Sequence, residues 1–257
     1  MYIDTHCHLD DQKLIDRVDK VVSDYQRENV TKVINVGCNA ETSRLCADMA
    51  KEYQSIYFAS GVHPIDAKDY IDDDFAVISN LCDMEKCVAV GEIGLDYYWD
   101  DSYKDKQKQV FVTMLELAKE KKLPTSIHMR NATLDTLELL KSNKDKLVYG
   151  GSLHCFSGSV ETAREILNLG LKIGFGGTLT FKNANKVLEV AKFTPLDCCL
   201  TETDCPYLSP EPYRGTINEP KNIPVICSFL AKIKNVDNVD LANIIMQNAL
   251  STFTKLK

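Results

Sequence analysis

Residues 2–8 read Tyr2-Ile3-Asp4-Thr5-His6-Cys7-His8, a short β-like run that ends on two histidines. Successive side chains of a strand point to opposite faces, so His6 and His8 share one face and Cys7 points to the other. A lone His-x-His pair is most often a pair of surface or hydrogen-bonded histidines. The pair becomes informative only if other ligating side chains converge on the same end of the fold.

Seven further β-like runs follow, and amphipathic segments separate them. Strands are predicted at residues 2–5, 31–36, 56–60, 87–90, 124–127, 147–153, 171–173 and 198–201. Helices are predicted at residues 14–28, 42–53, 75–84, 105–122, 134–142, 160–169, 183–192 and 241–253. In one of them Val110, Met114, Leu117 and Ala118 follow the 3.6-residue period of a helix buried on one face. Strict alternation of strand and helix implies a parallel sheet.

The polar residues at the strand ends decide between a closed barrel and an open, doubly wound sheet. Six of them stand at or just past the carboxyl ends of predicted strands one, four, five, six and eight: His6, His8, Glu92, His128, His154 and Asp204. A barrel brings these ends to one mouth, where barrel enzymes keep their chemistry, whereas an open sheet separates strands one and eight. We therefore predict an α/β fold of the TIM-barrel type, with eight parallel strands surrounded by helices. Residues 1–257 are expected to form one domain, since such barrels occupy about 250 residues.

Composition excludes several classes of protein. With 44% hydrophobic and 26% charged residues and no low-complexity segment, the chain is typical of a globular enzyme. We find no signal peptide and no apolar run near the ~18 residues of a membrane span, and we expect no membrane association and no obligate protein partner. Ten scattered cysteines indicate reduced thiols and a cytoplasmic location. A net charge of −7 argues against broad duplex binding, which requires a basic face.

Four of the five histidines and two carboxylates at one mouth predict a metal site. Buried charges are costly unless they are paired or bound to a metal. Imidazole ligands favour Zn²⁺, whereas carboxylates favour Mg²⁺ or Mn²⁺. A Cys–His nucleophile is not expected, because Cys7 and Cys155 alternate with inward-facing histidines and should point away from them.

Six ordered segments resemble the motifs of the TatD family of metal-dependent deoxyribonucleases, within the amidohydrolase superfamily. These segments are Ile3-Asp4-Thr5-His6-Cys7-His8-Leu9-Asp10, Gly61-Val62-His63-Pro64, Gly91-Glu92-Ile93-Gly94-Leu95-Asp96-Tyr97-Tyr98, Ile127-His128-Met129-Arg130, His154-Cys155-Phe156-Ser157-Gly158 and Glu202-Thr203-Asp204-Cys205-Pro206-Tyr207-Leu208. The resemblance runs from residue 3 to about Pro220. It implies a distorted TIM barrel and hydrolysis of DNA phosphodiesters, often as a 3′ to 5′ exonuclease.

The resemblance also implies two divalent metal ions, Mg²⁺ or Mn²⁺ in function with Zn²⁺ as the alternative. Its two ligand sets share Glu92: His6, His8, Glu92 and Asp204 surround one ion, and Glu92, His128 and His154 hold the other. Two cations about 3.5–4 Å apart can activate a water and stabilise charge on the phosphate and leaving oxygens. Asp204 is the candidate general base and Glu92 the bridging carboxylate. Alternatively, Asp204 is a structural ligand only.

Two further residues are candidates for substrate binding. His63, at the end of the third strand, would donate a hydrogen bond to a phosphate oxygen or, alternatively, cap the following helix. Arg130 follows His128 by two residues, and its planar fork suits a phosphate, although a salt bridge to a carboxylate at the mouth is nearly as plausible. Gly174-Phe175-Gly176-Gly177 ends the seventh strand and is either part of a phosphate site or, by default, a tight connection.

Aromatic residues follow three of the ligands and would let unpaired bases stack on them. They are Tyr97, Tyr98 and Trp99 after Glu92, Phe156 after His154, and Tyr207 after Asp204. Packing of Tyr97 and Tyr98 into the barrel rim is the favoured alternative.

The expected partner is DNA with single-stranded or frayed ends, and RNA is a second candidate. Rival activities are hydrolysis of a cyclic amide or amine by a superfamily amidohydrolase, or of an aminoacyl-tRNA ester. Much of that superfamily carries a modified lysine on the fourth strand, whereas this chain has Glu92, which favours the nuclease branch. A barrel that only binds nucleic acid would be expected to lack a ligand or the base, and none is missing.

Overall fold

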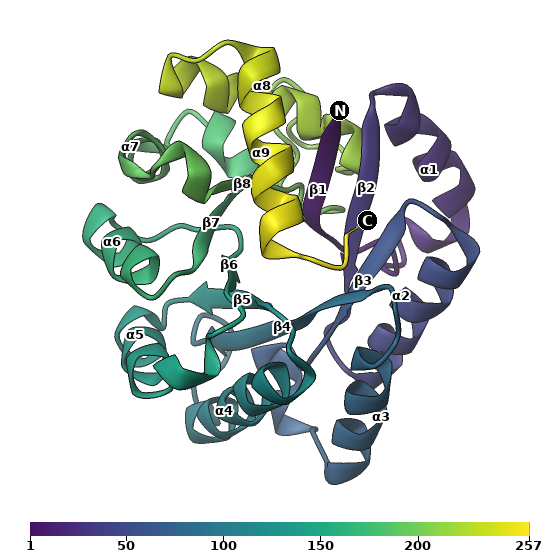
Figure 1. Cartoon of the computed structure of the whole chain (residues 1–257), viewed down its shortest axis with the longest axis vertical. Coiled ribbons are helices and arrows are strands. Elements are labelled where there is room, and N and C mark those ends of the chain that lie inside the picture. The colour runs from purple at the N-terminus through teal and green to yellow at the C-terminus, as the bar shows by residue number, and fades with distance from the viewer. Residues whose placement is uncertain (257) are drawn as a thin grey trace.

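The computed structural model describes residues 1–256 and contains one sheet of eight strands in the order β1-β2-β3-β4-β5-β6-β7-β8, with helices outside it (Figure 1). All seven neighbouring pairs are parallel. The strands are β1 (Tyr2–Cys7), β2 (Val30–Val36), β3 (Ile56–Ser60), β4 (Cys87–Asp96), β5 (Thr125–Arg130), β6 (Gly151–Leu153), β7 (Lys172–Phe175) and β8 (Cys199–Thr201). The predicted α/β barrel is confirmed.

The barrel is closed irregularly between its first and last strands. Within residues 1–256 no ladder pairs β8 with β1; instead the Thr5 hydroxyl donates to the Thr201 carbonyl oxygen at 3.1 Å. Nearer the mouth, the Asp204 N–H donates to the His6 carbonyl oxygen at 2.9 Å, and the His8 N–H donates to the Cys205 carbonyl oxygen at 2.8 Å. These bonds hold the segment after β8 against the end of β1, which carries the two histidines.

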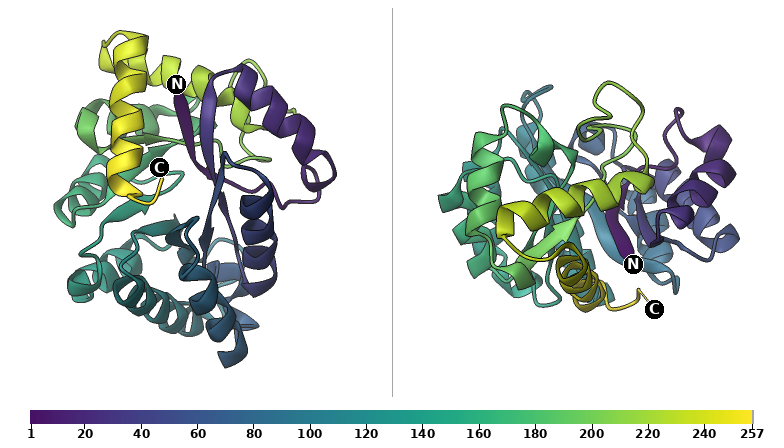
Figure 2. Two further views of the ribbon diagram at one scale, coloured as in Figure 1. Left: turned by 45° about the vertical axis from the view of Figure 1, so that its right-hand side comes forward. Right: turned by 90° about the horizontal axis from the view of Figure 1, so that it is seen from above.

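The helices surround the strands in a ring, and the last two follow β8 (Figure 2). They are α1 (Val18–Arg27), α2 (Ala40–Glu52), α3 (Asp72–Cys82), α4 (Lys104–Lys121), α5 (Thr133–Ser142), α6 (Val160–Asn168), α7 (Asn185–Phe193), α8 (Ile223–Lys234) and α9 (Asn238–Thr252). Helix α4 buries Val110, Met114, Leu117 and Ala118, as their spacing predicts. None of the helices in the described part of the chain combines the length and apolar character that a membrane crossing requires.

The main differences from the sequence-based expectation concern three elements. Strand β4 continues to Asp96, so Glu92 lies inside the strand and not at its end. The sixth strand begins only at Gly151, where Gly150 and Gly151 both have positive φ and a Cβ at residue 151 would collide with the backbone of Thr125. Helix α8 is absent from the prediction, although Pro224 at its first turn is a common helix start.

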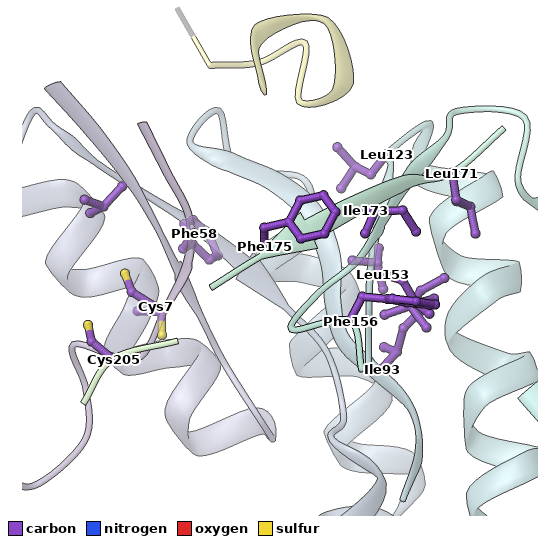
Figure 3. Packing of buried hydrophobic residues seen from close by; sticks show 14 of the residues in the cluster. Cys7, Phe58, Ile93, Leu123, Leu153, Phe156, Leu171, Ile173, Phe175 and Cys205 are labelled. Carbon is purple, nitrogen blue, oxygen red and sulfur yellow. The ribbon is translucent and has the colours of Figure 1, made fainter. Parts of the chain in front are cut away.

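Two clusters of buried apolar side chains form the core. The larger one includes Phe58, Phe156 and Phe175, which Figure 3 shows among their neighbours. The smaller one joins residues from β1, β2, β3, β4 and β8 to Ala249 of α9 and to Phe253, which directly follows that helix. Several of its strand residues, such as Ile3 and Val88, lie near the amino ends of their strands, so α9 covers the end of the barrel opposite the histidines.

Candidate metal centre

The structure brings the six predicted ligands together at the carboxyl end of the barrel. They come from five strands or the residues just after them: His6 and His8 at β1, Glu92 in β4, His128 in β5, His154 after β6 and Asp204 after β8. Their ligating atoms form overlapping groups of three in which all atoms lie within 4.8 Å of one another. The two-residue period of a strand therefore predicted correctly that His6 and His8 share one face, and their Nε2 atoms lie 3.2 Å apart.

Glu92 lies between two sets of imidazoles, and each carboxylate oxygen faces one set. Its Oε2 lies 3.4 Å from His6 Nε2 and 3.5 Å from His8 Nε2. Its Oε1 lies 2.8 Å from His154 Nε2 and 2.9 Å from His128 Nδ1. Asp204 Oδ1 joins the first set, 3.5 Å from His8 Nε2. The arrangement suits one carboxylate shared between two neighbouring cation positions.

Hydrogen bonds on the outer side of two rings orient their inner nitrogens. His8 Nδ1 lies 2.8 Å from the Val36 carbonyl oxygen, and His128 Nε2 lies 3.0 Å from Asp96 Oδ2. Because both partners accept hydrogen bonds, a neutral ring keeps its proton there and turns a bare lone pair inward. Inward atoms then crowd together, with His6 Nε2 and His8 Nε2 only 3.2 Å apart. Lone pairs and carboxylate oxygens at such distances require protons or cations between them, so the donor set fits divalent metal ions.

The electrostatics differ between the rings of the cluster: burial lowers the pKa of His6 to about 4, whereas the surroundings of Glu92 and His128 favour positive charge beside them. Burial alone would raise the pKa of Glu92, but the surrounding imidazoles, with His154 foremost and a hydrogen bond to His128, hold it well below its usual range. Burial alone would lower the pKa of His128, but hydrogen bonds to Asp96 and Glu92 raise it to about 9. Surroundings that favour a proton on an inward-facing imidazole also favour a cation in its place, since metal ligands must be deprotonated.

His63 lies beside the cluster and caps the short 3-10 helix η2 (Pro64–Lys68). Its Nδ1 accepts a hydrogen bond from the Ile65 N–H at 3.1 Å, and its Nε2 lies 3.5 Å from Glu92 Oε1. Burial lowers the pKa of His63 to about 3, so the ring is neutral and its proton sits on Nε2. The capping alternative is therefore what the structure shows, and the Nε2–H still points into the site, toward Glu92 Oε1.

Arg130 ends β5 and does not form the alternative salt bridge to a carboxylate at the mouth. In the described chain no Asp or Glu oxygen lies within ion-pair distance of its guanidinium. The group instead stacks on the Tyr98 ring, 3.8 Å from the ring centroid. Its hydrogen-bonding edges are consequently not committed to a carboxylate.

Several residues with a positioning role were missed from the sequence. Asp96 holds His128, and the Ser126 hydroxyl lies 3.1 Å from His6 Nδ1. Glu202 is fully buried, accepts a hydrogen bond from the Cys155 N–H, and lies 3.9 Å from His154 Nδ1. Asp96 and Glu202 each lie within one of the motif segments quoted above. A carboxylate in or directly after a predicted buried strand was the signal in the sequence that could have identified them.

The Gly-rich turn at residues 174–177 has a structural role. A Cβ at residue 174 would collide with the Glu202 carboxylate, and one at residue 177 would collide with the Leu208 carbonyl oxygen. The turn is therefore the tight connection expected by default.

Cys7 faces the core and donates to the Ile34 carbonyl oxygen, while burial raises the pKa of the Cys155 thiol far above its usual value. A thiol of that kind is not a nucleophile.

The aromatic residues near the mouth divide into two groups. Tyr97 is partly buried and donates to Asp135 at 2.7 Å, as packing predicts, and Phe156 is buried in the core. Phe156 is thus excluded as a stacking surface for bases. Tyr98, Trp99 and Tyr207 are 52%, 64% and 47% exposed, so the packing alternative is wrong for Tyr98.

Comparisons with known proteins agree with this geometry. The family model of the TatD related DNases matches residues 3–254. The chain is 43% identical to the uncharacterized metal-dependent hydrolase YabD of Bacillus subtilis, over 98% of this chain and 99% of that protein. It is 35% identical to the uncharacterized metal-dependent hydrolase YcfH of Escherichia coli K12, over 98% and 95% of the two chains. The crystal structure of YJJV, a TatD homologue from Escherichia coli K12, superposes with a TM-score of 0.93 at 30% identity, covering 98% of each chain.

A parallel barrel with a cluster of imidazoles and carboxylates at its carboxyl end defines a metal-dependent hydrolase. The whole-chain match and the identity to these relatives place it further: the chain belongs to the TatD family.

Proposed function

We propose that this chain is a nuclease that hydrolyses DNA phosphodiester bonds, acting from 3′ to 5′ on single-stranded or frayed ends, with RNA as a second candidate. The observation that carries the proposal is the position of Glu92, whose two oxygens face separate sets of imidazoles. Paired cation sites of that kind suit in-line displacement at phosphorus. Membership of a family described as DNases supports the same substrate class.

Two divalent ions are proposed, Mg²⁺ or Mn²⁺ in function with Zn²⁺ as the alternative. The ligand sets would be His6, His8, Glu92 and Asp204 for one ion, and Glu92, His128 and His154 for the other, following the side chains that each Glu92 oxygen faces. When bound, such cations supply positive charge that acidifies water and stabilises the charge growing on the phosphate and leaving oxygens.

Asp204 is the proposed general base. Its side chain is 15% exposed, whereas that of Glu92 is 3% exposed, so Asp204 is the ligand carboxylate that solvent can reach. Burial alone would raise the pKa of Asp204, but the hydrogen bond with His8 and the charges of neighbouring histidines keep it below the usual value. An ionised, solvent-accessible carboxylate can take the proton of the attacking water.

His63 and Arg130 are the proposed phosphate contacts. The His63 Nε2–H already points toward Glu92 Oε1 and would donate to a phosphate oxygen that enters the site. The Arg130 guanidinium offers in-plane N–H groups in the geometry that phosphate oxygens accept. Two such donors beside a carboxylate-rich centre favour a phosphate ester over a neutral amide.

Digestion of labelled DNA in the presence of Mg²⁺ or Mn²⁺ tests the proposal. The substrates are 3′- and 5′-labelled single strands, a frayed duplex, closed circular duplex and an aminoacyl-tRNA. We expect shortening of single strands from the 3′ end, slower attack on the duplex, and no cleavage of the circle. Equal cleavage of circle and single strands would remove the exonuclease proposal. Rapid loss of the aminoacyl group while DNA stays intact would favour the ester hydrolase.

A further inference from the structure

Two large aromatic side chains stand exposed at the carboxyl end of β4. Tyr98 is 52% exposed and Trp99 is 64% exposed, and their rings meet edge to face with centroids 4.9 Å apart. Scattered exposed apolar residues are common, but adjacent large rings beside a catalytic centre indicate a binding surface. The metal centre leaves both rings unused.

Arg130 completes this surface. Its guanidinium carbon lies 3.8 Å from the Tyr98 ring centroid and 5.4 Å from that of Trp99. A guanidinium that stacks by its face keeps its N–H groups in the plane, where they can still bind oxygen atoms. The three residues together, named here the aromatic platform, offer a ring face and a phosphate-binding edge side by side.

One carboxylate joins the aromatic platform to the metal centre. Asp96 Oδ2 lies 3.0 Å from His128 Nε2, while Asp96 Oδ1 accepts the Tyr98 N–H at 2.8 Å. The Tyr97 N–H donates to the Arg130 carbonyl oxygen at 2.9 Å, and Asp96 pairs with Arg130 in the β4–β5 register. The backbone under the platform is therefore held relative to a metal ligand.

We propose that Tyr98, Trp99 and Arg130 bind an unpaired nucleotide next to the bond that is cleaved. The base stacks on the Trp99 ring, and the phosphate of that nucleotide accepts hydrogen bonds from Arg130. Every base has a π face, so this contact tolerates any sequence, but it requires a base that is not covered by its neighbours in a duplex. The inference rests on the proposed nuclease function and gives a physical reason for a preference for single strands or frayed ends.

Trp99 is the only tryptophan in the chain, so its fluorescence reports directly on the aromatic platform. The metal-loaded protein is titrated with a short single-stranded oligonucleotide whose phosphorothioate linkages resist hydrolysis. A second titration uses an abasic oligonucleotide of the same length and backbone. Anisotropy of a labelled oligonucleotide measures the dissociation constant independently, which permits variants without tryptophan.

We expect the base-containing oligonucleotide to quench Trp99 and to bind more tightly than the abasic one. Trp99→Leu should weaken binding of the base-containing oligonucleotide by roughly 5- to 150-fold, the range for loss of one base–aromatic stack, and leave the abasic one nearly unchanged. Arg130→Gln should weaken both by about tenfold or more, because each keeps its phosphates. Both substituted residues are exposed, and circular dichroism checks that the variants are folded.

Two control variants make comparable substitutions at positions away from the mouth of the barrel. Tyr149→Leu removes a 41% exposed ring from the loop before β6, and Arg164→Gln removes a cation that lies 5.2 Å from the Phe193 ring. Neither should alter binding. Equal binding of the two oligonucleotides, an unquenched Trp99 at saturation, or control variants as weak as Trp99→Leu would overturn the proposal. Quenching of Trp99 without any DNA cleavage would support the aromatic platform and contradict the proposed nuclease activity. DNA cleavage without quenching of Trp99 would support the nuclease activity and contradict the aromatic platform.

Discussion

Glu92 and Asp204 are both carboxylates of the candidate metal centre, but their surroundings suit them to different roles. Glu92 is almost wholly buried and touches both sets of imidazoles, whereas Asp204 touches one set and reaches solvent. Substitutions at these two positions should therefore separate metal binding from proton transfer.

Glu92→Ala is expected to lose most of the bound metal together with activity. The change removes one ligand from each proposed ion and leaves the repulsion between the cations uncompensated. Elemental analysis of the purified variant measures the metal content. Glu120→Ala, at an exposed position on α4, serves as the control and should keep its full metal content. A Glu92→Ala chain that retains two ions would show that Glu92 is not the bridge.

Asp204→Asn is expected to keep the ion held by Glu92, His128 and His154 while turnover falls. The amide preserves the shape and one oxygen but is not a base, so single-turnover rates should drop by about 10²–10⁴-fold. Substrate affinity should change little. Wild-type turnover in this variant would mean that another group accepts the proton, even if the metal ligands are assigned correctly.

At the scale of elements, α9 matters because it covers the end of the barrel opposite the metal centre. Phe253 follows the last turn of α9, is fully buried, and packs in the cluster with residues of β1, β2, β3, β4 and β8. The helix contributes stability at that end of the barrel.

Phe253→Ala should lower the free energy of unfolding by about 3–5 kcal/mol, the cost of emptying an aromatic site in a core. Activity per folded molecule should be preserved. Val239→Ala, on the same helix and 66% exposed, is the control and should change stability by less than about 0.5 kcal/mol. Denaturant unfolding measures both values, and a loss below about 1 kcal/mol for Phe253→Ala would contradict the packing described above.

At the scale of the whole molecule, the net charge of −7 and the closely spaced acceptor atoms at the mouth indicate that bound cations contribute to both activity and stability. Removal of metal by a chelator is expected to abolish hydrolysis, and Mg²⁺ or Mn²⁺ should restore it. Metal should also raise the melting temperature, because an ion that binds only the folded chain at about 100 times its Kd adds ~2.7 kcal/mol of stability. Calorimetry with and without metal measures this shift. Full activity in excess chelator, after metal loss is verified, would contradict the prediction.

Much of the candidate site was predictable because strand geometry is local. The two-residue period predicted His6 and His8 on one face. The convergence of strand ends at the mouth of a barrel predicted that His128, His154 and Asp204 lie close to them. The hydrogen-bond partners of these ligands were not predictable. Asp96 reaches His128 only through the register in which Gly94 pairs with His128 and Asp96 with Arg130, and a pairing between strands is not visible in either strand alone.

Exposure of the aromatic residues also depended on the tertiary structure. Tyr98 and Phe156 both follow a ligand along the chain, yet Tyr98 is exposed and Phe156 is buried. Local sequence determined the elements, their alternation and the directions of the ligands, since these follow from periods of two and 3.6 residues. Only the packing of distant segments decided that Glu92 lies between two imidazole sets and that Arg130 stacks on Tyr98, because both contacts join residues from different strands or loops.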